Sequence, residues 1–150
     1  METQVHKQNS DNNLITSAHA TLHCLTGCVI GEVTGLSIGL LLGLSVWSTI
    51  ILATSLAYIS GFTLGLLPVM KHKKKSFLEA LKMIWLGEAI SIGVMEIVMN
   101  AVDYAMGGMQ ADSILSPIFW IAIVVAVIAG FLAAWPVNWW LLSKHLKKCH

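Results

Sequence analysis

Four long apolar stretches dominate this chain, and each is long enough to cross a lipid bilayer as a helix. A bilayer core requires about 20 predominantly apolar residues per helix. The stretches cover residues 18–46, 47–70, 77–104 and 117–142. The chain is 56% hydrophobic and 11% charged, and its mean hydropathy of +0.75 is too high for an ordinary soluble domain. We therefore predict an all-α fold, a four-helix transmembrane bundle integral to the cytoplasmic (plasma) membrane.

Short polar segments separate the predicted helices. A very short turn near residues 44–48 joins the first two, so these must form an antiparallel hairpin. A lysine-rich segment at 71–76 follows the second helix, and a loop with a Gly pair precedes the fourth. Residues 1–16 are rich in Asn, Gln and Ser, which predicts a disordered cytoplasmic tail. The four-helix domain is expected to cover residues 17–148.

All nine positive charges are lysines, and they lie on one side of the predicted membrane. With four spans and the tail inside, every lysine lies in a cytoplasmic segment or at the inner interface. The positive-inside rule then places both termini in the cytoplasm. Trp139 and Trp140 fit an aromatic belt at that interface. A chain without arginine and with a net charge of +1 offers no argument for a nucleic-acid partner.

The segment HATLHCLTGC places two histidines and two cysteines at the mouth of the first helix. On a helical wheel, His19 and His23 lie on one ridge, and Cys24, Cys28 and Glu32 lie on the next. Thiolate and imidazole ligands together favour copper(I) or zinc over magnesium or calcium. The spacing differs from that of zinc fingers, and membrane interfaces also tolerate His and Cys. A metal site and a merely packed helix start both stay open.

The third helix carries acidic residues where the bilayer would lie. Its polar and thioether side chains fall within about 80° on a helical wheel or just beside it. They are Glu88, Met95, Glu96, Met99, Asn100 and Asp103. Buried carboxylates are costly in hydrocarbon, so they are expected to face the bundle interior and to meet an ion or a partner there.

Depth along the helices suggests how these residues divide. Glu88 and Glu32 are expected at a similar depth, so both are assigned to the Cys/His metal site. The remaining five residues on the third helix would form a pathway beyond it. Alternatively, the carboxylates are protonated or hydrogen-bonded within the protein, and the methionines are core residues.

Glycine recurs at every fourth position of the first helix. The positions are Gly27, Gly31, Gly35, Gly39 and Gly43. In lipid, small residues at this spacing let a second backbone approach closely. We therefore predict tight helix packing along this ridge.

Three segments resemble a domain-of-unknown-function family of small four-helix bacterial and archaeal membrane proteins. They are HATLHCLTGCVIGE, MEIVMNAVDYAMGG and WPVNWW, and the likeness spans about residues 17 to 145. The resemblance implies a four-helix membrane fold and a connection to copper, because some relatives occur beside or fused to copper proteins. It implies no activity and no site residues.

We predict that the protein binds a soft transition-metal ion, with copper favoured and zinc as the alternative, and translocation of that ion stays open. Two other functions stay open. One is a noncatalytic accessory subunit of a larger membrane oxidase or transporter, in which the glycine ridge docks a partner. The other is a haem-binding electron-transfer subunit that uses histidines such as His23 and His72. The sequence contains no nucleophile-and-base pair, phosphate loop or zincin motif, so no enzymatic activity is predicted. The expected partners are the lipid bilayer and either a second copy of the chain or a larger membrane complex.

Overall fold

The computed structural model describes residues 2–74 and 76–144. All the regular secondary structure in these ranges is helical. The elements are α1 (Glu2–Leu41), α2 (Val46–Lys73), α3 (Phe77–Met106), the short 3₁₀ helix η1 (Gly108–Gln110) and α4 (Pro117–Ser143). No β-strand occurs in the described ranges. The predicted all-α class and the four long helices are therefore confirmed.

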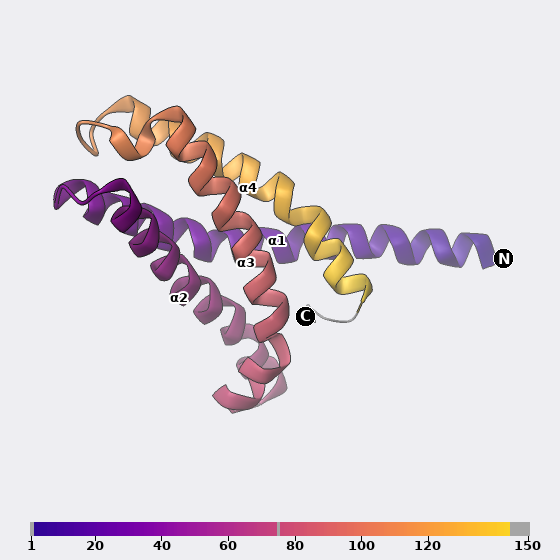
Figure 1. The fold of residues 1–150 in the computed structure, drawn as a ribbon. Helices are drawn as coiled ribbons and strands as arrows, with labels where there is room; N and C mark the ends of the chain where they lie inside the picture. Colours follow the sequence, from indigo (N-terminus) through magenta and orange to yellow (C-terminus); the bar gives the residue numbers. More distant parts are fainter. Residues whose placement is uncertain (1, 75, 145–150) are drawn as a thin grey trace.

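α1 begins at Glu2, whereas the sequence predicts a helix start near residue 18 after a disordered tail. The polar N-terminal segment continues the helix outward, beyond the other three (Figure 1). Neither glycine nor proline occurs before Gly27, so the first turns contain none of the residues that most strongly disfavour a helix. The change from polar to apolar composition therefore does not mark the helix boundary.

Gly43 sets the turn between α1 and α2. Its φ is 62°, in the left-handed region that glycine adopts without strain. The Gly43 N–H donates to the Leu40 carbonyl at 3.2 Å, and the Leu44 N–H donates to the Gly39 carbonyl at 2.9 Å. This pair of bonds is the Schellman pattern that ends a helix. The prediction placed Gly43 in the packing ridge, but its position belongs to the turn, and nothing lies within 4 Å of where a Cβ would be.

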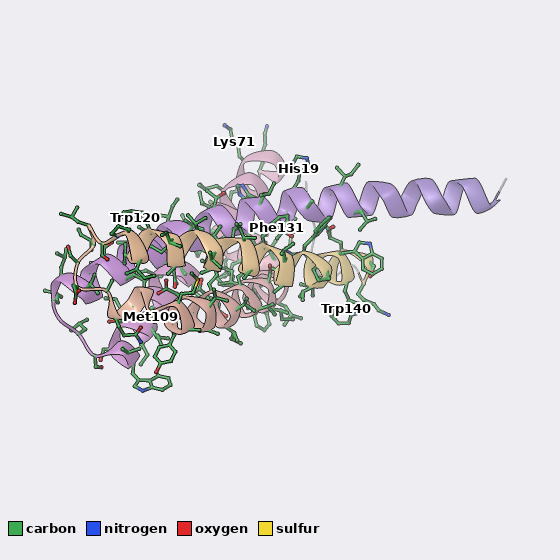
Figure 2. All side chains as sticks on the ribbon, turned by 90° about the horizontal axis from the view of Figure 1, so that it is seen from above. His19, Lys71, Met109, Trp120, Phe131 and Trp140 are labelled. Atoms are coloured by element: carbon green, nitrogen blue, oxygen red, sulfur yellow. The ribbon has the colours of Figure 1, made fainter. Side chains whose placement is uncertain are left out.

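The four helices form two hairpins that pack against each other. α1 lies along α2, and α4 packs on both α1 and α3 (Figure 1). The α1–α2 turn and the α3–α4 connection lie at the same end of the molecule. Met109 and Trp120 lie toward that end, and Trp140 lies toward the other (Figure 2). The connection between α2 and α3 lies away from both hairpin turns (Figure 1).

Three of the described helices contain a segment long and apolar enough to cross a membrane. The segments are Leu14–Leu41, Val46–Lys71 and Pro117–Ser143. α3 is not among them, and it is the helix that buries Glu88, Glu96 and Asp103. The acidic face of α3 is thus buried against three more apolar helices, while its other face is exposed.

Candidate functional site

Two thiols lie side by side on the face of α1 that meets α3. Cys24 and Cys28 are free and buried, with 3% and 0% of their surface exposed. Their side chains are within hydrogen-bonding reach of each other. The Ser91 hydroxyl of α3 donates to the Cys24 Sγ at 3.7 Å. Cys28 also lies close enough to Glu88 and Glu96 to interact with their charges.

Two methionines of α3 belong to the same buried cluster as the thiols. Met95 and Met99 are fully buried there together with Cys24 and Cys28. Met99 also reaches α4, because a Cβ added at Gly130 would lie 3.1 Å from the Met99 Sδ. The bundle interior therefore gathers two thiols and two thioethers, all of which are soft donors.

A pair of carboxylates lies next to this sulfur cluster. Glu32 of α1 and Glu96 of α3 are both 2% exposed, and their carboxyl groups are within hydrogen-bonding reach of each other. The Asn100 side-chain amide donates to Glu96 Oε2 at 3.3 Å and to the Thr54 hydroxyl of α2 at 3.3 Å. Thr54 is also within hydrogen-bonding reach of Glu96. Side chains from three helices thus converge on Glu96.

Several oxygens of this group have no hydrogen-bond partner. They are both carboxylate oxygens of Glu32, Oε1 of Glu96, Oδ1 of Asn100 and both carboxylate oxygens of Asp103. Asp103 is 1% exposed, and it interacts electrostatically with Glu32. Burying a charged or polar oxygen without a partner costs several kcal/mol or shifts its protonation. A group of buried oxygens without partners is therefore expected to bind a proton or a cation.

The sequence pairs Glu32 with Glu88, but the structure places Glu32 against Glu96. The prediction assumed that α1 and α3 run parallel and enter the membrane at matching residues. α3 instead crosses α1 obliquely (Figure 1), which brings Glu96 to the level of Glu32. Glu88 lies nearer α2, where a Cβ at Gly65 would be 3.3 Å from its Cδ.

The two histidines of the first motif lie apart from the thiols. His19 and His23 are exposed, and His19 points away from the body of the bundle (Figure 2). A ring nitrogen of His23 lies 2.8 Å from the Leu64 carbonyl, to which it donates. Among the side chains that the structure describes, no three from His, Cys, Asp and Glu are grouped to hold a metal ion. The side chain of His72 lies outside that set.

The glycine ridge of α1 lies against small residues of α2. The opposed pairs are Gly27 with Gly61, Gly31 with Ala57, Gly35 with Ala53, and Gly39 with Thr49. A Cβ added at Gly27 would lie 2.6 Å from the Gly61 Cα, closer than real Cβ atoms come. The Ser60 hydroxyl also donates to the Gly27 carbonyl at 2.6 Å. α2 occupies this ridge, so it is not available to dock a partner.

Sequence reasoning missed Thr54 and Ser91 as members of the interior group. A threonine or serine in an apolar helix usually bonds to the carbonyl four residues earlier, as Thr26 and Thr63 do here. Position within an otherwise apolar stretch is the only signal that could have identified Thr54. That signal does not separate it from Thr63, which is exposed.

The protein is thus all-helical and has three candidate membrane spans. Its interior contains a buried group of thiols and carboxylates. The chain belongs to the family described as Domain of unknown function (DUF4396), whose model matches residues 15–147. This confirms the resemblance seen in the sequence. No curated protein and no solved structure matches the chain.

Proposed function

We propose that this protein is an integral membrane protein that binds a soft transition-metal ion, copper in preference to zinc, and passes it through the bundle interior. The observation that carries the proposal is the pair of buried thiols, Cys24 and Cys28, in one cluster with Met95 and Met99. Thiolate and thioether ligands select copper(I). A copper(I) ion accepts few ligands, so the thiol pair needs no third residue of the His, Cys, Asp and Glu types.

The membrane setting rests on helix length and charge. Three helices, α1, α2 and α4, have the length and composition of membrane spans. The fourth, α3, packs against all three. Lys71, Lys74 and Lys144 are exposed at the α2–α3 connection and after α4, away from the hairpin turns. The positive-inside rule then directs both termini and this connection to the cytoplasm. A tag inserted after Gln110 should be labelled from outside intact cells, and labelling of a terminal tag instead would reverse the orientation.

The carboxylates supply the onward route from the thiols. Glu96 and Asp103 are separated by on the order of 10 Å along α3, at ~1.5 Å per residue. Asn100 lies between them, one turn after Glu96. In the proposed orientation, this row leads from the thiol pair toward the outer end of the bundle. A cation that left the thiols would meet the Glu96 carboxylate, then the Asn100 amide and then the Asp103 carboxylate.

Metal content of the purified protein tests the proposal. The double variant Cys24→Ser, Cys28→Ser keeps the side-chain size but removes both soft ligands, so copper measured by mass spectrometry should fall to background. The matched control is Cys149→Ser, which changes a thiol elsewhere in the chain and should leave the copper content unchanged. Full copper retention by a correctly folded double variant would contradict the proposal.

A further inference from the structure

We propose that the interior also contains a separate site for a hard divalent cation of the Mg²⁺, Ca²⁺ and Mn²⁺ type, ligated by oxygen and not by sulfur. The ligands come from α1, α2 and α3. They are the carboxylates of Glu32 and Glu96 and the hydroxyl of Thr54. The site goes beyond the proposed function, because it requires neither thiol.

The geometry already brings these oxygens together. The carboxyl groups of Glu32 and Glu96 are within hydrogen-bonding reach, and so are Glu96 and Thr54. Asn100 acts as the positioning residue, because its amide donates to the Glu96 backbone carbonyl at 2.8 Å and also reaches Glu96 Oε2 and the Thr54 hydroxyl, each at 3.3 Å. Glu96 Oε2 thus has a hydrogen-bond partner, which leaves Oε1 for a ligand.

The carboxylate oxygens without a hydrogen-bond partner point to a cation as their ligand. Both oxygens of Glu32 and Oε1 of Glu96 have no hydrogen-bond partner in the protein. Each side chain is only 2% exposed, so bulk water does not replace that partner. Two ionised carboxylates in contact repel each other strongly inside a protein. One divalent cation neutralises both charges and provides a partner for all three oxygens.

A single shared proton would serve these groups less well. It satisfies one oxygen on each side chain, leaves one negative charge buried, and leaves one oxygen of Glu32 without a partner. Carboxylate and hydroxyl oxygens are also the ligands that Mg²⁺, Ca²⁺ and Mn²⁺ prefer, and Mg²⁺ commonly uses only one or two carboxylates with waters completing its shell. The donor set thus differs in kind from the sulfur cluster beside it.

Manganese(II) provides a direct probe. Purified full-length protein, stripped with a chelator, is titrated with Mn²⁺ while electron paramagnetic resonance measures the free ion. One saturable site per chain is expected, with Mg²⁺ or Ca²⁺ as competitor. Glu32→Gln and Glu96→Gln should each weaken Mn²⁺ binding at least about tenfold, because loss of even a group that only supports a metal ligand has an effect of that size.

Two controls locate the effect. Glu79→Gln makes the same change at an exposed acidic residue in the first turn of α3 and should bind Mn²⁺ like the wild type. The double variant Cys24→Ser, Cys28→Ser should keep Mn²⁺ binding even where it loses copper. Failure of the copper site and failure of this site are therefore measured separately.

Three results would overturn the site. One is the absence of saturable Mn²⁺ binding to the wild type, and another is wild-type binding by Glu32→Gln. The third is an infrared band of a protonated carboxylic acid that persists at saturating Mn²⁺ and disappears in Glu32→Gln, since it would show a proton at the position of the ion. If the variants do not fold, a rise in the wild-type melting temperature with Mn²⁺ still supports the site, and an unchanged temperature rejects it.

Discussion

The two buried faces of α1 differ in what they place against their neighbours. Toward α2, the helix presents glycines, and the backbones approach so closely that no Cβ fits at Gly27 or Gly31. Toward α3, it presents two thiols and a carboxylate, and the Glu32 oxygens have no partner. One face is filled completely, and the other retains unsatisfied polar atoms.

This difference separates stability from function within a single helix. Close backbone contact between small residues is the usual source of helix association in lipid. Buried polar atoms without partners lower stability, and proteins retain them mainly where they serve a site. The glycine face therefore holds the helix in position, while the face toward α3 carries the chemistry.

The largest expected effect is on the glycine face. Gly31→Val adds three carbons where even one Cβ would collide with the Ala57 backbone, so α1 and α2 must separate. Overpacking of this kind should reduce the free energy of unfolding by about 3 kcal/mol or more. Thermal melting in detergent, followed by circular dichroism, measures the loss.

Gly43→Asn is the matched control, because Gly43 has open space around it and asparagine tolerates its left-handed φ. It should melt close to the wild type. If Gly31→Val did the same, the helices would not depend on their close approach, and the two faces of α1 would not differ as described.

An effect of opposite sign is expected on the face toward α3. In chelator-treated protein, Glu32→Gln removes one of two facing negative charges and adds an amide that can donate to Glu96. The free energy of unfolding should rise by about 1–3 kcal/mol, the range associated with satisfying a buried polar group. The measurement is melting in the presence of a chelator, with the exposed Glu79→Gln as control. A lower melting temperature for Glu32→Gln would mean that this carboxylate stabilises the fold even without an ion.

The helices themselves could be predicted from the sequence because their apolar stretches are long and clearly separated. α3 and α4 begin and end within two residues of their predicted bounds. The start of α1 could not be predicted, because Glu, Gln and Lys extend a helix outside the bundle as readily as inside it. The turn after α1 lies slightly earlier than predicted, since Gly43 adopts a positive φ and ends the helix.

The arrangement of the interior was less accessible to prediction. A helical wheel shows that Cys24 and Cys28 share a ridge, but it does not show which neighbour that ridge faces. The crossing of α3 over α1 decides that Glu32 meets Glu96 and not Glu88. Such pairings depend on the angle and offset between helices, which side-chain packing determines and which no single helix encodes.

The smallest expected effect tests whether side-chain hydrogen bonds contribute to the α1–α2 contact. The Ser60 hydroxyl donates to the Gly27 carbonyl at 2.6 Å, but it also approaches the Leu56 carbonyl of its own helix at 2.8 Å. Ser60→Ala should therefore lower the free energy of unfolding by only about 0.6 kcal/mol, the average for such bonds in membrane bundles. Ser55→Ala is the control, since the exposed Ser55 hydroxyl bonds to the Ile51 carbonyl within α2. A loss for Ser60→Ala as large as that for Gly31→Val would show that the hydrogen bond, and not the approach of the two backbones, holds α1 to α2.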